Sequence, residues 1–529
     1  MPPRMVSVAP TPRGSFSFRV SPGRLPRLCL AVRADTVSEL LLRAERAARE
    51  STLIELRLDL LKQPELAIQP LRDFLRSSPQ TLAIGTCRKA TYGGGFKGSV
   101  EAQLKLLRDA ALAGCALVDM ELQSAERLPE TALAGLRQHT NLIVSYHDEK
   151  TTPALAPLWT RMQAVEADVY KLAVTATLWR HNAEVLRFVE THSGEQTLVA
   201  FCMGEMGLTS RILSPRSGSA FTFAALHADE ATAPGQPDLA TLRQLYHVEN
   251  LNRATKIYGV LGYPLAHSLS PRMHNAAYRR LGMNAVYLPL AARRPTDVLD
   301  HADQIPLSGM SVTHPYKSAF LDRLERIDPI GEAVGAINTV VRSQGKFYGY
   351  NTDVAGIVEP LGQALPLRGA RILVIGAGGA ARAAVFGLRS RGAHVFILNR
   401  TRSKAQALAT AAKAKVVNRA DLKKLDFHAI VQATPVGQFP KIKESPLTAD
   451  EIRAEVVFDL VYNPWETALT KLAAAKGARI IHGVEMFVHQ GARQFELWTG
   501  KPAPIDDMRR EVLAALATVG QPDLAAADK

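Results

Sequence analysis

A lysine and a histidine interrupt two apolar, strand-like runs in the first half of the chain. Lys171 lies in DVYKLAV, and His147 ends LIVSYH, the preceding run. A buried lysine amine can attack a carbonyl to form an imine, and an imidazole moves protons near neutral pH. Alone, the lysine is equally explained by a side chain that reaches the surface, and the histidine by a core residue. On neighbouring parallel strands, the pair indicates imine chemistry assisted by proton transfer.

These runs belong to a series that positions them. Near-continuous apolar strands that alternate with helices are typical of a parallel sheet covered on both faces. Eight such units in about 200 residues predict a (β/α)8 barrel. Charged or titratable residues within or at the end of several runs favour an active site, because burying a charge without a partner or a function is costly. The runs cover 28–32, 53–59, 82–87, 115–122, 142–147, 168–174, 198–203 and 221–226, and these residues are Glu55, Arg57, Arg88, Asp119, Glu121, His147 and Lys171.

A glycine-rich turn marks the second half. It follows the strand-like run RILVI and opens a helical pattern, a context in which backbone N–H groups bind a pyrophosphate. The next strand-like run ends in an arginine and a hydroxyl, where an NAD-binding fold usually has an acid for the ribose 2′-hydroxyl. We therefore expect NADP(H). The turn comprises Gly376, Ala377, Gly378, Gly379 and Ala380, and the second strand ends in Asn399, Arg400 and Thr401.

Composition restricts the class of protein. The chain has 529 residues, of which 47% are hydrophobic and 22% charged, and a formal net charge of +14. No uncharged apolar run approaches the roughly 18 residues that span a bilayer, so we expect a protein without membrane partners. The basic residues are spread without zinc-finger spacing, so nucleic-acid binding would rest on charge alone and we expect none. No metal site is predicted.

The N-terminal segment and the cysteines bear on the compartment. Residues 1–24 contain arginine, proline and serine and no acid, which suits either a transit peptide or an unstructured leader. The four cysteines are far apart and each lies in an apolar run, which suits a reducing compartment. We expect the cytosol, with the plastid stroma as the alternative.

The first half resembles the type I 3-dehydroquinate dehydratases over about residues 25–245. ELRLD, TCR, SYHD, YKLAV, MGEMGLTSR and ATAPGQP occur in that family's order. The resemblance implies that Lys171 forms a Schiff base with the ketone of 3-dehydroquinate. It also implies that His147 removes the adjacent proton and returns one to the departing hydroxyl, which gives 3-dehydroshikimate. The substrate contacts that it implies are Glu55, Arg57, Arg88, Met203, Arg211, Thr232 and Gln236.

Two residues of this half depart from the family pattern. Thr232 stands where the family has a serine, which keeps the hydroxyl and adds a methyl group. Tyr92 stands where the family has a glutamate that helps to orient the histidine. The departure leaves open a catalytically impaired barrel, or a binding or regulatory protein built on it. Retention of both Lys171 and His147 speaks against these readings.

The second half is similar to the shikimate dehydrogenases over about residues 255–520. The motifs are AHSLSP, SVTHPYK, GAINTV, GYNTDVAG, DLVYNPWET and VEMFVHQGARQFELWTG. The resemblance implies that Lys317 donates a proton when hydride reduces the ketone, with Asp353 paired beside it. The implied substrate contacts are Ser268, Ser270, Thr313, Lys317, Asn338, Asp353, Tyr462 and Gln490, and Gly483 joins the cofactor-binding residues.

Together the two halves predict consecutive steps of the shikimate pathway, because the product of the first is the substrate of the second. The closest rival is a second half that acts on quinate. Oligomeric state and channelling stay open. The predicted order is a leader at 1–24, the barrel at 25–249, a substrate domain at 255–365, a Rossmann NADP-binding domain at 366–483 and C-terminal helices at 484–520 that return to the substrate domain.

Overall fold

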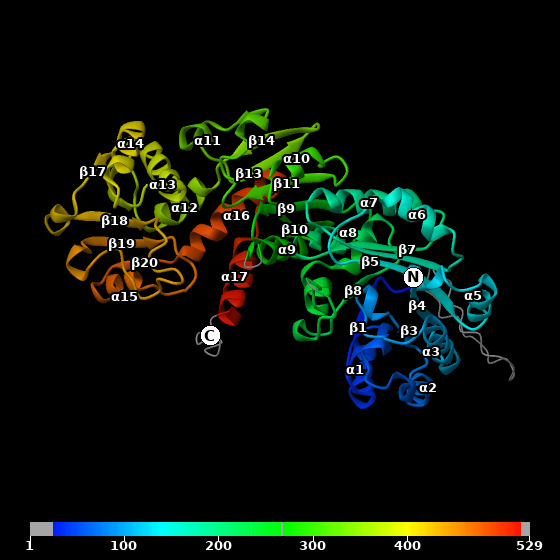
Figure 1. Ribbon diagram of the computed structural model, residues 1–529. Coiled ribbons are helices and arrows are strands. Elements are labelled where there is room, and N and C mark those ends of the chain that lie inside the picture. The colour runs from blue at the N-terminus through cyan, green and yellow to red at the C-terminus, as the bar shows by residue number, and fades with distance from the viewer. Residues whose placement is uncertain (1–24, 234, 266–267, 520–529) are drawn as a thin grey trace, which may run out of the picture. The chain divides into compact units, whose positions relative to one another are not determined.

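The computed structural model describes residues 25–233, 235–265 and 268–519. The chain divides into two compact units, one that ends at Asn252 and one that comprises Leu178–Arg180 and the residues from Arg253 on (Figure 1). The predicted leader at 1–24 and the first two residues of AHSLSP lie outside the described residues. Each unit is built from alternating strands and helices.

The first unit is an eight-stranded parallel sheet that curves into a nearly closed barrel. Its strand order is β7-β6-β5-β4-β3-β2-β1-β8. The backbone N–H of Ala220, just before β8, donates to Leu198 O of β7 at 2.7 Å, so the two ends of the sheet meet. The predicted barrel is confirmed. The strands are β1 (Leu28–Val32), β2 (Leu53–Arg57), β3 (Leu82–Thr86), β4 (Leu117–Glu121), β5 (Asn141–Asp148), β6 (Val169–Thr175), β7 (Leu198–Met203) and β8 (Thr222–Ala224).

Helices cover the outside of this sheet. In α3, the Ser99 side chain accepts from Ala102 N at 3.2 Å to start the helix, and Gly114 at φ 117° ends it. Apolar side chains such as Ile84, Val169 and Phe221 fill the interior of the barrel. The helices are α1 (Val37–Glu50), α2 (Ile68–Ser77), α3 (Val100–Ala113), α4 (Leu122–Ala125), α5 (Glu130–Arg137), α6 (Leu155–Gln163), α7 (Arg180–His192) and α8 (Leu208–Ser217).

The second unit begins with a mixed six-stranded sheet in the order β10-β9-β11-β13-β14-β12. Strands β13 and β14 form an antiparallel hairpin, and β9 pairs in parallel with both β10 and β11. The strands are β9 (Lys256–Gly262), β10 (Ala285–Ala291), β11 (Leu307–Val312), β12 (Arg326–Ile327), β13 (Thr339–Ser343) and β14 (Lys346–Tyr350), and the helices are α9 (Ser270–Arg280), α10 (Thr296–Asp300), α11 (Pro329–Val334) and α12 (Asp353–Ala364).

A second six-stranded sheet follows in this unit, entirely parallel and in the order β17-β16-β15-β18-β19-β20. This is the strand order of a dinucleotide-binding Rossmann fold, with the first strand, β15, at the topological switch point. The predicted Rossmann domain is confirmed. Its elements are β15 (Arg371–Ile375), β16 (His394–Leu398), β17 (Lys415–Val416), β18 (Phe427–Gln432), β19 (Ala454–Asp459), β20 (Arg479–Ile481), α13 (Gly379–Ser390), α14 (Arg402–Ala412) and α15 (Ala468–Ala475).

Two helices after the Rossmann sheet contact the mixed sheet and its helix α9. From α16 (Gly483–Thr499), Trp498 Nε1 donates to Val340 O of β13 at 3.0 Å. From α17 (Ile505–Val519), Glu511 accepts from Arg279 of α9 at 3.1 Å. Among the described residues, no helix combines the length and the apolar character needed to cross a membrane.

Candidate active sites

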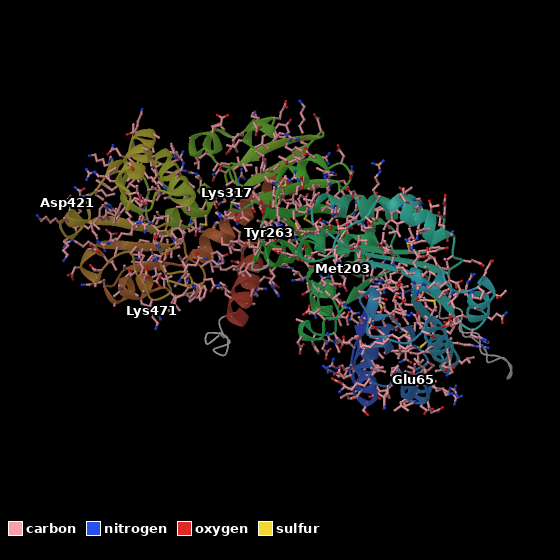
Figure 2. All side chains as sticks on the ribbon, in the orientation of Figure 1. Glu65, Met203, Tyr263, Lys317, Asp421 and Lys471 are labelled. Carbon is pink, nitrogen blue, oxygen red and sulfur yellow. The ribbon has the colours of Figure 1, made fainter. Side chains whose placement is uncertain are left out.

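The first candidate site is a pocket near the carboxyl ends of the barrel strands. Every barrel residue named above as catalytic or substrate-binding lines it. Figure 2 shows where Met203, the last residue of β7, lies in the barrel. The lining consists of Glu55, Arg57, Arg88, Gly93, His147, Glu149, Lys171, Ala173, Phe201, Met203, Arg211, Phe223, Thr232, Ala233 and Gln236.

The amine of Lys171 is held between two carboxylates. Its Nζ atom donates to Glu55 Oε1 at 3.0 Å and to Asp119 Oδ2 at 2.8 Å, and the side chain is 3% exposed. Two hydroxyls complete the arrangement, because Thr86 donates to Glu55 at 2.9 Å and Ser145 donates to Asp119 at 2.5 Å. The amine therefore has a fixed position and two bases within reach.

The local charges set the protonation of the neighbouring groups. Burial alone would raise the pKa of the Glu55 carboxyl, but the cations Lys171, Arg57 and Arg88 hold it below its usual range. Burial lowers the pKa of His147 well below its ordinary value, and Arg88 and Lys171 lower it further. Near neutral pH, Glu55 is thus an anion and the imidazole of His147 is neutral. Its Nδ1 atom is buried and has no hydrogen-bond partner among the described residues.

The arginines of the pocket differ in how they are paired. Arg57 donates to Asp59 through two hydrogen bonds of 2.9 and 2.7 Å, so its charge is compensated. Arg211 is 2% exposed and lies over the ring of Phe201 at 4.3 Å, and its Nη2 atom has no hydrogen-bond partner among the described residues. Burial lowers the pKa of Arg211 to about 10. A buried cation without a counterion fits an anionic ligand.

The remaining predicted residues of the pocket follow β7 and β8. Thr232 donates to Gln236 Oε1 through its backbone N–H at 2.7 Å and its hydroxyl at 2.9 Å, which fixes that amide. Three further residues were not named from the sequence as site residues. Asp119 stood out only as a charge in an apolar run, Phe223 places its ring 4.2 Å from Lys171 Nζ, and Glu149 lines the pocket two residues after His147.

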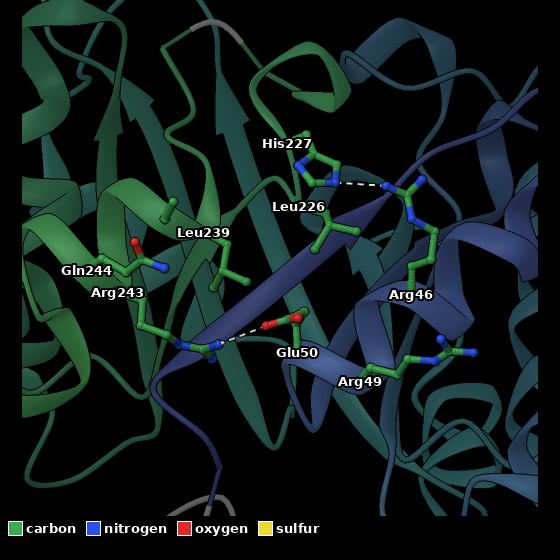
Figure 3. A pocket seen from close by; sticks show the side chains of 9 residues that line it. Arg46, Arg49, Glu50, Leu226, His227, Leu239, Arg243 and Gln244 are labelled. Atoms are coloured by element: carbon green, nitrogen blue, oxygen red, sulfur yellow. Dashed lines mark hydrogen bonds and ion pairs between the residues drawn. The ribbon is translucent and has the colours of Figure 1, made fainter. Parts of the chain in front are cut away.

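A larger cavity of the barrel unit lies elsewhere, between α1 and the segment after β8 (Figure 3). It measures about 360 Å³, against about 70 Å³ for the pocket around Lys171. Two of its three arginines already have partners: Arg46 donates to His227 Nε2 at 2.8 Å, and Arg243 pairs with Glu50 at 3.6 Å and Glu249 at 2.9 Å. None of the residues predicted to be functional lines it, so the smaller pocket is the candidate site.

In the second unit, a lysine and an aspartate are directly hydrogen-bonded. Lys317 Nζ donates to Asp353 Oδ2, and Figure 2 marks the position of Lys317. Asn338 Nδ2 donates to Asp353 Oδ1 at 2.8 Å and to Gln490 Oε1 at 3.3 Å. Asp353 is the first residue of α12 and 4% exposed, whereas the Lys317 side chain is 32% exposed. Four predicted residues thus form one connected polar cluster, and one of them, Lys317, can give up a proton.

The other predicted substrate residues come from further segments of the second unit. Thr313 follows β11 and accepts from Tyr316 N at 2.9 Å in the turn that carries Lys317. Ser268 precedes α9 and Ser270 is its first residue. The phenol of Tyr287 hydrogen-bonds with Ser270 and with Ser311, and sequence reasoning did not single out this tyrosine. Tyr462 stacks on Phe487 of α16 with ring centroids 5.2 Å apart, on the helix that carries Gln490.

The Gly-rich turn has the geometry of a phosphate cradle. Gly376 has φ 121°, and a Cβ there would lie 2.9 Å from Ala433 O, so only glycine fits. A Cβ at Gly378 or Gly379 would meet no atom within 4 Å, which leaves this backbone open to a ligand. Ala377 lies in the turn and Ala380 in the first turn of α13, whose N-terminal N–H groups favour an anion.

One feature just after β16 suits a dinucleotide that carries a 2′-phosphate. Arg400 is exposed just after β16 and makes no hydrogen bond or ion pair with another described residue, whereas Asn399 donates to Thr401 O at 2.9 Å. Gly483 opens α16, and a Cβ there would lie 2.5 Å from Val461 O. The residues present therefore fit NADP(H).

Comparisons with known proteins match both halves of the chain. The type I 3-dehydroquinase family model matches residues 28–253. Models of the shikimate dehydrogenase substrate-binding domain, of shikimate/quinate 5-dehydrogenase and of the shikimate 5′-dehydrogenase C-terminal domain match residues 260–340, 361–444 and 483–513.

Individual relatives match one half or both. A shikimate dehydrogenase (NADP(+)) of Bacillus cereus is 40% identical over 275 residues, which cover 49% of this chain and 99% of that protein. The solved structure of shikimate 5-dehydrogenase from Thermus thermophilus is 35% identical, covers 49% of this chain and 100% of its own, and has a TM-score of 0.46. The chloroplastic bifunctional 3-dehydroquinate dehydratase/shikimate dehydrogenase of Arabidopsis thaliana is 34% identical over 502 residues, which cover 90% of this chain and 82% of the relative. With both halves matched in one relative of the same arrangement, the chain belongs to the family of bifunctional 3-dehydroquinate dehydratase/shikimate dehydrogenases.

Proposed function

We propose that Lys171 and His147 dehydrate 3-dehydroquinate in the barrel, and that Lys317 and Asp353 serve the reduction of the resulting 3-dehydroshikimate. The chain is a bifunctional enzyme, a type I 3-dehydroquinate dehydratase and an NADP-dependent shikimate dehydrogenase. The observation that carries the residue assignment in the barrel is the clamped amine of Lys171 beside a buried, neutral imidazole.

The barrel chemistry begins at the amine. The ammonium of Lys171 gives a proton to Asp119, which lies 2.8 Å away, and the amine attacks the substrate ketone. Loss of water leaves a protonated imine, which withdraws electrons from the adjacent carbon. His147 takes a proton from that carbon and returns one to the departing hydroxyl, which leaves as water. Hydrolysis of the imine then releases 3-dehydroshikimate and restores the amine.

The substrate carboxylate has a natural partner in the pocket. Arg211 is a buried cation that has no counterion within the described part of the chain, whereas Arg57 is already paired with Asp59. A carboxylate that binds Arg211 supplies the missing counterion and orients the ring with its ketone toward Lys171. We assign the substrate hydroxyls to the polar groups of Glu55, Arg88 and Gln236, which line the same pocket.

In the second unit, Lys317 is the proton donor for the substrate oxygen. Bound NADPH supplies the hydride. As the oxygen gains negative charge, the ammonium of Lys317 stabilises it and gives it a proton, and Asp353 fixes the lysine through their hydrogen bond. Asn338 and Gln490 are joined to Asp353 in one network, which positions the substrate hydroxyls.

We further propose that the enzyme works in the cytosol. All four cysteines are buried and unpaired, which suits a reducing compartment but does not separate cytosol from stroma. Fusion of residues 1–24 to a fluorescent protein, followed by incubation with isolated chloroplasts, tests the choice. A fusion that stays outside supports the cytosol, whereas import supports the stroma.

One coupled assay tests both activities. The purified chain receives 3-dehydroquinate and NADPH, and the nicotinamide absorbance is followed for the wild type, Lys171→Ala and Lys317→Ala. We expect oxidation by the wild type only, and rescue of Lys171→Ala alone by 3-dehydroshikimate. Oxidation by Lys171→Ala with 3-dehydroquinate contradicts the assignment of Lys171. The reverse reaction tests the substrate of the second unit. If NADP is reduced faster with quinate than with shikimate, the assigned substrate is wrong.

A further inference from the structure

The pocket around Lys171 contains one carboxylate that has no partner. Glu55 and Asp119 both bind Lys171, and Asp59 binds Arg57. Glu149 lines the same pocket and makes no hydrogen bond or ion pair with any other described residue. Glu149 is an exposed residue at the pocket wall, so its carboxylate is solvated and is not fixed by a partner among the described residues, in a pocket that contains several cations.

The same pocket also contains an imidazole nitrogen without a partner. His147 Nδ1 is buried and accepts or donates no hydrogen bond within the described part of the chain. A neutral imidazole that gives and takes protons at one nitrogen works best when a second group holds the other nitrogen. The pocket thus combines an unpaired acceptor, Glu149, with an unpaired imidazole nitrogen.

The backbone brings Glu149 to the same pocket as this imidazole. His147 is the penultimate residue of β5, and Glu149 comes two residues later, in the bend that follows the strand. Asp148 Oδ1 accepts from the backbone N–H groups of Lys150 and Thr151, each at 2.9 Å, so a fixed turn follows the strand. The side chain of Asp148 is therefore occupied, and Glu149 is the acid that this turn leaves in the pocket.

The loop after β3 makes room for the carboxylate. A Cβ built on Gly93 would lie 2.5 Å from Glu149 Oε1, so the carboxylate occupies the space that a side chain at residue 93 would fill. Gly93 has φ 79°, a conformation that favours glycine. Gly94 N donates to Lys89 O at 3.1 Å and holds this loop in place. Gly93 also lines the pocket, so Glu149 Oε1 lies at its wall.

We infer that Glu149 is a positioning residue for His147, whose carboxylate accepts a hydrogen bond from Nδ1–H in the enzyme–substrate complex and fixes the tautomer in which Nε2 exchanges protons. In the substrate-free structure, Glu149 contacts Gly93 and makes no hydrogen bond with the imidazole, so a side-chain rotation accompanies substrate binding. The role takes on a task that falls to a glutamate at residue 92 in the family pattern, where this chain has Tyr92. The inference rests on the proposed role of His147.

The charges that face His147 give the inference a measurable sign. Arg88, Lys171 and Arg57 disfavour the imidazolium, whereas Glu55 and Asp119 both bind Lys171 and share its single positive charge. A carboxylate at Nδ1 favours the imidazolium, so it raises the pKa of His147 in the complex. Removal of the Glu149 charge therefore moves the acid limb of kcat toward lower pH.

The test compares Glu149→Gln, which keeps the shape and removes the charge, with Glu149→Asp and with Glu45→Gln. Glu45 is an exposed residue of α1 outside the pocket, so its variant changes the net charge alone. For Glu149→Gln we expect a fall in the kcat of dehydration of about tenfold or more, a smaller change in KM, and an acid limb displaced to lower pH. Glu149→Asp retains the position of the limb, and Glu45→Gln behaves as the wild type.

Two outcomes overturn the inference, and they differ from failure of the proposed function. A Glu149→Gln variant whose kcat stays within about twofold of the wild type excludes the role. A slower variant whose acid limb does not move shows a structural effect only and excludes it as well. Borohydride trapping of the imine, detected by the added mass on the Lys171 peptide, is measured in parallel. Its absence from the wild type overturns the proposed function together with the inference.

Discussion

The Nζ atom of Lys171 lies 2.8 Å from Oδ2 of Asp119, and both side chains are almost completely buried. The second contact of the amine, 3.0 Å to Glu55, makes a triad of one cation and two anions inside the barrel. Ser145 holds the other oxygen of Asp119 at 2.5 Å, so the carboxylate cannot rotate away without losing two hydrogen bonds. This arrangement fixes the amine of Lys171, the proposed nucleophile. Its position depends on Asp119, which comes from β4, two strands away in the sheet.

Asp119→Asn is expected to destabilise the barrel. The new amide places N–H donors against the buried ammonium of Lys171, which loses one of its two anionic partners. We expect this loss to lower the free energy of unfolding by about 1–3 kcal/mol. The matched control is Glu126→Gln, which removes one charge from an exposed pair with Arg161 and costs less than about 1 kcal/mol. Hydrogen exchange in peptides of β4 and β6, followed against urea, reports the barrel alone. Equal urea midpoints for the two variants contradict the prediction.

The dehydratase activity should persist to mildly acidic pH. Burial and the charges of Arg88 and Lys171 lower the pKa of His147 well below 6.5, so the neutral, basic form survives as the pH falls through that value. Glu55 also stays ionised, because its pKa is below the usual range. We expect kcat/KM for 3-dehydroquinate, which reports the substrate-free enzyme, to have its acid limb below pH 6.5. A limb at or above that pH contradicts the assignment, and shikimate oxidation at each pH verifies that the chain is intact.

The architecture could be predicted from the sequence because buried parallel strands appear as continuous apolar runs. Strand β7 coincides with the run 198–203, and β1 with 28–32, since a strand covered on both faces is apolar throughout. The turn around Gly376 could also be predicted from the sequence. Its backbone has a positive φ and passes close to Ala433, which requires the glycine that marks the turn.

The pairing inside the pocket was not predictable in the same way. Arg57 and Arg211 look alike in the sequence, yet Asp59 neutralises the first, while the second has no ion-pair partner among the residues that the structure describes. Glu149 showed no signal beyond its two-residue spacing from His147, because its contact with Gly93 depends on how two distant loops meet. Such contacts are set by tertiary packing, and local pattern does not encode them.

Arg400 should determine the preference for NADPH. It is exposed after β16 and has no partner among the described residues, so its guanidinium is available to a 2′-phosphate. Arg400→Ala is expected to raise the KM for NADPH by about tenfold or more and to leave the KM for NADH nearly unchanged. Arg391→Ala, which removes an exposed arginine at the far end of α13, is the control. A parallel loss for both cofactors would mean that Arg400 supports the fold and does not read the phosphate.

Two glycines of the same turn should fail in different ways when each is changed to alanine. At Gly376, φ is 121° and the new Cβ would lie 2.9 Å from Ala433 O, so Gly376→Ala strains the backbone and lowers stability by about 1–3 kcal/mol. At Gly378, the new Cβ would have no atom within 4 Å, so we expect the stability of the fold to be unchanged. The added methyl nevertheless stands where a pyrophosphate approaches the start of α13, so Gly378→Ala should keep the melting temperature of the wild type while the KM for NADPH rises about tenfold or more. Differential scanning fluorimetry and initial rates measure the two quantities on the same preparations. A Gly378→Ala variant with an unchanged KM would place the pyrophosphate away from this turn, and a lowered melting temperature would show that residue 378 is packed.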